Sequence, residues 1–200
     1  PDLRSEGADT SGIPYALIFA MAGLDIEFAG DGAIAALTKA QARRALRYVP
    51  WELNGFPRWF EAFFRQWRAL ILDFLWSEIL WELANTPAEG SFSHILSDII
   101  YHGPWLQEEV APRLFAWLST HHAPSVCALS YMRTIILKGQ GATAAQIAAL
   151  ARGNINDTTT PADQRPIWYA LWVDSEPAPA IRALDILFAS NALDDRRSFA

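Results

Sequence analysis

The chain contains few of the residues on which several classes of protein depend. Among its 200 residues there is one cysteine, which excludes an intrachain disulfide framework and a cysteine-rich zinc site. No uninterrupted apolar run reaches the roughly 18 residues that a membrane-spanning helix requires. Basic residues are outnumbered, with 16 Lys and Arg against 22 Asp and Glu and a net charge of −6. That balance disfavours nucleic acids and anionic membranes as partners.

Apolar side chains, in contrast, are abundant. Hydrophobic residues make up 52% of the chain and include nine Trp and eleven Phe, which is too apolar for a disordered protein. We predict a polar tail or linker over residues 1–12 and a single all-helical domain over residues 13–200. The chain begins without Met, and residues 194–200 read like the start of another helix, so we expect a segment of a longer protein. The excess of Arg over Lys favours a bacterial source, and without a signal-peptide pattern we expect a cytoplasmic location.

Helix boundaries are marked repeatedly along the sequence. Thr38 with Gln41, and Thr143 with Gln146, form capping boxes, in which each side chain satisfies a backbone N–H at the helix start. We expect Gly153 to end the second of these helices as a C-cap. Apolar residues at helical spacing predict further helices over 58–66, 70–84, 93–102, 105–119, 125–138 and 180–189. No segment alternates with the period of a strand, so we predict an all-α fold.

Two short stretches recur within the sequence. Trp51-Glu52-Leu53-Asn54-Gly55-Phe56-Pro57 returns thirty residues later as Trp81-Glu82-Leu83-Ala84-Asn85-Thr86-Pro87, and Pro57-Arg58-Trp59-Phe60 returns as Pro112-Arg113-Leu114-Phe115. With their short connections, residues 37–199 resemble irregular HEAT-like or armadillo-like α-helical repeats, which implies a short α-solenoid of stacked antiparallel helix pairs.

The Trp-Glu-Leu-Asn-Gly-Phe-Pro stretch and the short capped helices are also similar to the helical arrays of large bacterial STAND-type NTPases, including NACHT proteins of antiviral defence. That resemblance implies a regulatory helical region beside a nucleotide-binding domain. No P-loop signature occurs in these residues, so the ATPase domain of such a protein would lie outside them.

One cluster has residues that can bind a metal. His94, Asp98 and His102 recur every four residues and so project along one face of a predicted helix. Imidazole and carboxylate groups together suit zinc or iron. The three positions nevertheless span about 12 Å along a helix, too far for one ion, so we expect a simple polar face, no bound metal and no cofactor. His121 and His122 are expected to cap the end of the helix over 105–119.

Aromatic residues form two adjacent rows on one predicted helix. Phe56, Phe60 and Phe64 make one row, and Trp59, Phe63 and Trp67 make the other. Such a stripe favours burial between neighbouring helices, and the alternative is a ligand groove or a partner-binding surface.

These observations favour a non-enzymatic protein-interaction or sensing module. Its partner would be another protein or other domains of the parent chain. Tryptophan and arginine are enriched in interface hot spots, and those near helix ends are the candidates for binding: Trp51, Trp81, Trp105, Arg58 and Arg113. One alternative is the regulatory region of a STAND-like defence NTPase. Another is a helical-bundle metal-dependent enzyme that uses the face carrying His94, Asp98 and His102.

Overall fold

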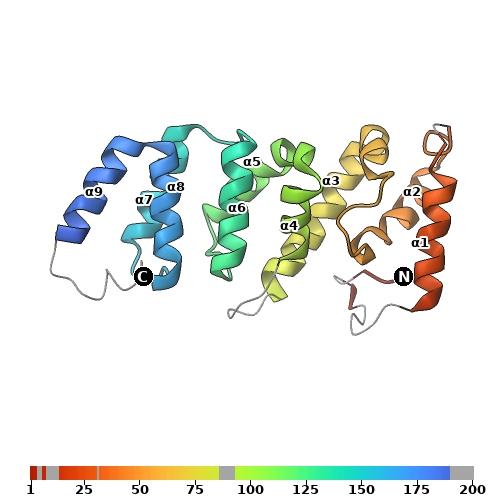
Figure 1. Ribbon diagram of the computed structural model, residues 1–200, viewed down its shortest axis with the longest axis horizontal. Helices are drawn as coiled ribbons and strands as arrows, with labels where there is room; N and C mark the ends of the chain where they lie inside the picture. The colour runs from red at the N-terminus through yellow and green to blue at the C-terminus, as the bar shows by residue number, and fades with distance from the viewer. Residues whose placement is uncertain (4–5, 8–13, 31, 86–92, 190–200) are drawn as a thin grey trace. The chain divides into compact units, whose positions relative to one another are not determined.

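Every regular element of the described residues is a helix (Figure 1). The computed structural model describes residues 1–3, 6–7, 14–30, 32–85 and 93–189. No strand occurs among them, which confirms the all-α prediction for this part of the chain. Residues 86–92 and 190–200, including the expected helix start at 194–200, lie outside the described residues, as does most of the predicted tail. The chain divides into two compact units, one formed by residues 1–85 and 94–104 and the other by residues 86–93 and 105–200.

The first unit contains four α-helices. They are α1 (Tyr15–Glu27), α2 (Lys39–Leu46), α3 (Phe60–Asn85) and α4 (His94–Tyr101), with a short 3-10 turn at Val49–Trp51. Thr38 and Gln41 form the predicted capping box of α2, in which the Thr38 backbone N–H donates to Gln41 Oε1 over 2.8 Å. The sequence signal therefore locates the start of α2 correctly.

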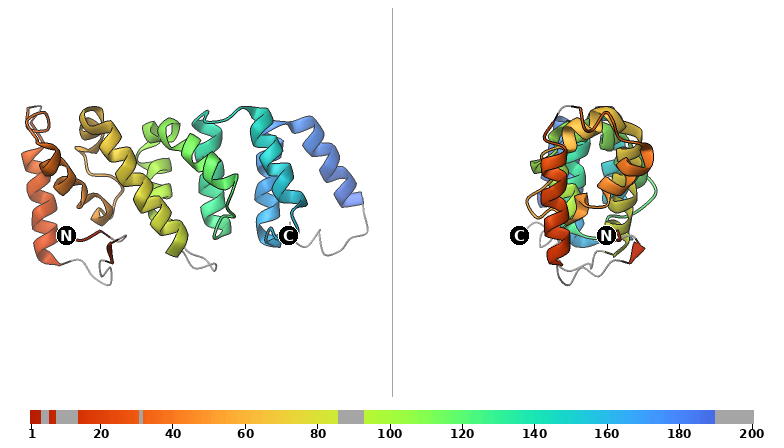
Figure 2. Two further views of the ribbon diagram at one scale, coloured as in Figure 1. Left: turned by 180° about the vertical axis from the view of Figure 1, so that it is seen from behind. Right: turned by 90° about the vertical axis from the view of Figure 1, so that its right-hand side faces the viewer.

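Helix α3 spans 26 residues (Figure 2), but it consists of two helical segments joined at a kink at Trp67, where φ is −121° and ψ is 31°. The kink falls in the gap between the predicted helices over 58–66 and 70–84, which confirms that predicted boundary. No proline or glycine stands between Gln66 and Leu70, so the helix bends at one residue and then resumes.

An aromatic cluster forms the core where α1 meets the start of α3. Phe28 follows α1 directly, and its ring lies 5.1 Å from that of Trp59, edge to face, and 5.8 Å from that of Phe63. All three side chains are buried, which confirms the core prediction for Trp59 and Phe63. Trp67 differs from the prediction, because at the kink its side chain is only half-buried.

A buried carboxylate joins α3 to α4. Both carboxylate oxygens of Glu82 accept hydrogen bonds from the Ile95 backbone N–H, at 3.0 and 3.2 Å. Ile95 is in the first turn of α4, where backbone N–H groups lack partners within the helix and a negative charge is favourable. Glu82 thus serves as a distant N-terminal cap for α4. Glu78, one turn earlier, is also buried.

The second unit contains α5 (Gln107–Leu118), α6 (Val126–Lys138), α7 (Ala144–Asn156), α8 (Arg165–Ser175) and α9 (Pro177–Ala189). Helix α5 packs on α6, α7 on α8, and α8 on α6 and α9 (Figure 1). The capping box of Thr143 and Gln146 is present at the start of α7. Gly153 does not end that helix, which continues to Asn156, because its backbone adopts the ordinary helical conformation.

Ion pairs tie the helices of the second unit together. Arg133 on α6 binds Asp174 on α8, and Arg152 on α7 binds Glu176, just after α8, over 2.7 Å. The guanidinium of Arg152 also lies 5.5 Å from the ring centre of Trp172 on α8, a cation–π distance. The basic side chains of these packed helices are thus used within the unit.

We predict that Phe63→Ala and Trp67→Ala differ in their cost. Phe63 is fully buried, so its truncation should lower the free energy of unfolding by ~3–5 kcal/mol. Trp67 is half-buried and should cost clearly less. Denaturant titration of the two variants measures the difference, and an equal or greater loss at Trp67 would contradict it.

A second prediction concerns two glycines of the second unit. A Cβ on Gly141 would lie 2.5 Å from Pro112 N and 2.8 Å from Ala111 C, both of which are backbone atoms of α5 that cannot rotate away. Gly141→Ala should therefore destabilise the protein by ~1–3 kcal/mol. Gly153→Ala has open space around it in α7 and should instead stabilise it by ~0.5–1 kcal/mol. Thermal unfolding of both variants tests the opposite signs.

Candidate functional site

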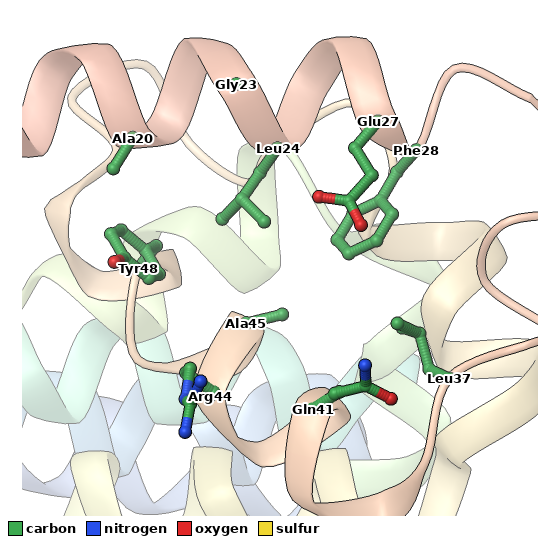
Figure 3. A pocket seen from close by; sticks show the side chains of 10 residues that line it. All are labelled: Ala20, Gly23, Leu24, Glu27, Phe28, Leu37, Gln41, Arg44, Ala45 and Tyr48. Atoms are coloured by element: carbon green, nitrogen blue, oxygen red, sulfur yellow. The ribbon is translucent and has the colours of Figure 1, made fainter.

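A groove runs between α1 and α2 in the first unit (Figure 3). The two helices lie on its opposite sides, and their side chains point into the space between them. Its volume is about 340 Å³. Its lining residues are Ala20, Gly23, Leu24, Glu27, Phe28, Leu37, Gln41, Arg44, Ala45 and Tyr48. On each helix these positions are three or four residues apart, so each helix contributes one continuous face.

The groove is apolar along its length and polar at its ends. Leu24 and Ala45 line its middle, whereas Glu27 and Gln41 face each other at the end near Leu37 (Figure 3). Tyr48 stands at the opposite end. The Gln41 carbonyl already accepts hydrogen bonds from Thr38 at 2.7 and 2.8 Å, so its amide nitrogen remains to donate to a ligand. Such a surface suits a segment with an apolar side and polar flanks.

The groove stays open partly because of Gly23. This residue lies between Ala20 and Glu27 on the groove-lining face of α1, and a Cβ added to it would meet no atom within 4 Å. A larger side chain can therefore be introduced at this position beside the groove without its Cβ displacing neighbouring atoms. Gly23 is for this reason the position chosen to narrow the groove.

Next to the groove, α2 carries a cluster of guanidinium groups. Arg43, Arg44 and Arg47, called here the arginine face, line a second cavity of about 570 Å³ together with Asp2 and Tyr48. Arg44 and Tyr48 line both this cavity and the α1–α2 groove. The two surfaces therefore adjoin one another around α2.

Residues at the beginning of the chain already occupy part of the arginine face. Arg47 Nη1 donates to Glu6 Oε1 over 3.2 Å, and Nη2 donates to the other Glu6 oxygen and to Asp2 Oδ1, the latter over 3.1 Å. Arg47 Nε also donates to the carbonyl of Pro1 over 2.6 Å. Arg43 and Arg44 have no ion pair with any of the described residues. One arginine is thus occupied by carboxylates and two are available.

The outer face of α1 is apolar and exposed. Tyr15, Phe19 and Ile26 are 82%, 75% and 79% exposed, and Ile18 between them is half exposed. Their spacing of three, four and seven residues places them on one stripe of the helix. Because Leu17, Leu24 and Phe28 make the inner face apolar as well, α1 is a helix with two apolar sides, of which the outer is uncovered.

The residues predicted to bind a protein divide between the two units. In the first unit Arg58 is exposed, Trp81 is half-buried and Trp51 is buried. In the second unit Arg113 is exposed and Trp105 is half-buried. None of the five lines the α1–α2 groove.

The predicted metal-binding face lies on and after α4. His94 and His102 are exposed and Asp98 is half-buried, and His102 lies just beyond the last residue of the helix. Within the part of the chain that the structure describes, no three His, Cys, Asp or Glu side chains come close enough to hold an ion. A Cβ on Gly55 would lie 2.5 Å from His102 Cδ2, so this histidine packs against the glycine backbone.

His121 caps α5 as predicted, whereas His122 contacts residues that follow α7. His121 Nδ1 lies 3.0 Å from the Trp117 carbonyl, and its ring stacks on that of Trp117. His122 lies 3.7 Å from Asp157. Hydrogen bonds from the Thr159 backbone N–H and hydroxyl, aided by His122, lower the pKa of Asp157.

The groove and the arginine face were missed by sequence reasoning, although two signals mark them. Residues 15–28 are apolar at positions that cover both sides of a helix, and residues 38–48 hold four cations and no carboxylate. The positive charge of residues 38–48 is not visible in the net charge of the whole chain, because acidic residues elsewhere outweigh it.

Comparison with known proteins finds no matching family model, no similar curated protein and no similar solved structure. None of the helices in the described ranges is long and apolar enough to cross a membrane. The site must therefore be interpreted from its own geometry.

The hydrogen bonds to Glu6 predict a pH dependence. The hydrogen bond from Arg47, followed by that from the Leu3 backbone N–H, lowers the pKa of Glu6 below its ordinary value of 4.5. The contact of Glu6 with Arg47 should therefore be at full strength above pH 4.5 and weaken as the pH falls through the lowered value. NMR titration of the Glu6 carboxyl carbon measures that midpoint. Arg47→Gln should return it toward 4.5, and an unchanged midpoint in the variant would contradict the prediction.

Proposed function

We propose that this chain is a non-enzymatic protein-interaction module that receives an amphipathic segment of another protein, or of another domain of its parent chain, against α1. The observation that carries the proposal is that α1 is apolar on two sides, of which the outer is uncovered and the inner is covered only in part. Its outer stripe is exposed, and its inner face borders the open α1–α2 groove. A helix that is hydrophobic all round is normally buried, and exposed apolar patches mark interaction sites.

The openness of the groove favours a macromolecular segment over a small molecule. Small-molecule sites usually enclose most of their ligand's surface. Here Gly23, Glu27, Gln41 and Arg44 are exposed, and Leu24 is half-buried, so one side of any ligand would face solvent. A peptide or helix that continues beyond the groove can bury its contact face there and leave the other face exposed.

The finer architecture is part of the proposal. We propose that the helix pairs stack as a short α-solenoid, since α5 with α6 and α7 with α8 pack as sequence neighbours within the second unit. Such arrays present successive helix faces to partners. The placement of this module in a bacterial STAND-like defence NTPase stays a prediction from the sequence resemblance, and an upstream P-loop in the parent chain would support it.

The experiment that tests the function fills the groove. Gly23→Leu places a side chain among Ala20, Leu24 and Glu27, and the helix itself should gain ~0.5–1 kcal/mol because leucine is the better helix former. Gly153→Leu makes the same change in the open space beside α7 and serves as the matched control. We expect proteins captured by the wild type and by Gly153→Leu to be lost with Gly23→Leu, as measured by quantitative mass spectrometry.

A second pair of variants tests the outer stripe in the same assay. Ile26→Glu adds a charge to the stripe, and Leu53→Glu adds one at an isolated exposed leucine, 78% exposed. Capture should fall with Ile26→Glu alone. If Gly23→Leu and Ile26→Glu, folded by circular dichroism, both capture every wild-type partner, α1 is not the binding element.

A further inference from the structure

The arginine face of α2 has a charge opposite to that of the chain as a whole. Residues 38–48 carry Lys39, Arg43, Arg44 and Arg47 and no Asp or Glu, in a chain whose net charge is −6. Arg47 follows Arg43 by four residues and Arg44 by three, and all three arginines line one cavity at the end of the helix. This concentration of positive charge provides an attractive surface for an anionic group.

Arg47 shows which anion the surface accepts. Its two terminal nitrogens bind the two oxygens of Glu6, which is the parallel two-bond geometry of an arginine–carboxylate pair. The second nitrogen also binds Asp2, and Nε binds a backbone carbonyl. The carboxylates of Asp2 and Glu6 and the backbone carbonyl of Pro1 therefore lie on the arginine face, all three bound to Arg47.

Arg43 and Arg44 extend this surface beyond what the chain's own segment uses. Both are exposed, and neither pairs with a carboxylate of the described residues. They line the same cavity as Arg47 and Asp2, and Arg44 also lines the α1–α2 groove. A longer acidic segment could thus bind all three arginines, whereas Asp2 and Glu6 bind only Arg47.

We propose that the arginine face binds an acidic segment of a partner protein, and that Asp2 and Glu6 occupy it when the partner is absent. This inference rests on the proposed function and names the chemistry of the partner: Asp or Glu side chains beside an apolar stretch that enters the groove. Binding then requires that Asp2 and Glu6 leave Arg47, so these two carboxylates compete with the partner.

The test uses fluorescent poly-L-glutamate and measures anisotropy at low ionic strength with the full 200-residue chain. Asp2→Asn with Glu6→Gln removes the internal competitor and should tighten binding about fivefold or more relative to the wild type. Glu108→Gln with Asp185→Asn changes the net charge equally at exposed positions of the second unit and should tighten it much less. Equal tightening in the two double variants would overturn the proposal, because only net charge would then matter.

Arginine variants identify the binding surface. In the Asp2→Asn, Glu6→Gln background, Arg43→Ala with Arg44→Ala should weaken binding about tenfold, since two charge-assisted contacts are lost. Arg58→Ala with Arg182→Ala removes two exposed arginines elsewhere and is the matched control, expected to weaken it far less. Similar losses in both would overturn the assignment to α2.

The alternative interpretation is that the arginine face binds phosphate groups. Single-stranded oligothymidylate with the same net charge as the poly-L-glutamate tests this interpretation. If it binds through Arg43 and Arg44 while poly-L-glutamate does not, the surface recognises phosphates and the proposal is wrong. Gly23→Leu separates this inference from the proposed function, because filling the groove should leave poly-L-glutamate binding unchanged. Suppose that Gly23→Leu loses partner capture and that no variant binds poly-L-glutamate. The proposed function would then be supported, and only the proposal of an acidic segment would be overturned.

Discussion

The ring of Phe28 is the contact on which the arrangement of the first unit depends. It packs edge to face on Trp59 and against Phe63, and so fixes the C-terminal end of α1 to the start of α3. Leu17, near the other end of α1, is also buried, but the residues between them are exposed or half-buried. Helix α1 is therefore held at its ends and stands away from α2 along its middle, and the groove is the space that results (Figure 3).

Tyr48 connects the parts of the site. It lines the groove, the arginine-face cavity and a third cavity formed with Leu17 and Trp51. Apolar contact in the groove and charge on the arginine face thus meet at one residue. A partner that places an apolar side chain in the groove brings its neighbouring residues to Arg44, which gives the two kinds of contact a common register along α2.

Local signals in the sequence were sufficient to predict most of the helices. They failed where a helix end or cap depends on residues that are distant in the sequence. Capping boxes at Thr38 and Thr143 act within one turn and are present as predicted. The kink at Trp67 also falls between the two helices that the sequence predicts, whereas the continuation of α7 through Gly153 was not predicted. The cap of α4 by Glu82 spans thirteen residues and was equally inaccessible.

The site was harder to predict than the fold. Both of its signals depend on which apolar side chains stay uncovered and which charges stay unpaired, and a sequence pattern does not specify either. Apolar positions on two sides of residues 15–28 read simply as a helix, and only the structure shows that Tyr15 and Phe19 stay uncovered. The charge of residues 38–48 disappears in a sum over the whole chain. The net charge correctly indicates that the chain as a whole is acidic, but it does not reveal the basic arginine face.

A comparison of arginines within the molecule indicates that the arginine face is not needed for stability. In the second unit, Arg133 and Arg152 pair with carboxylates across packed helices, which is the usual structural use of such charges. Positive charge near the end of α2 is favoured by the helix dipole by ~0.3–1 kcal/mol, an effect confined to the last turn. Arg43 and Arg44 lie in that last turn and Arg47 follows it directly, so the dipole favours a positive charge at each of these positions. Repulsion among the neighbouring guanidinium groups opposes this effect, and the binding of an acidic segment, as proposed above, would relieve that repulsion.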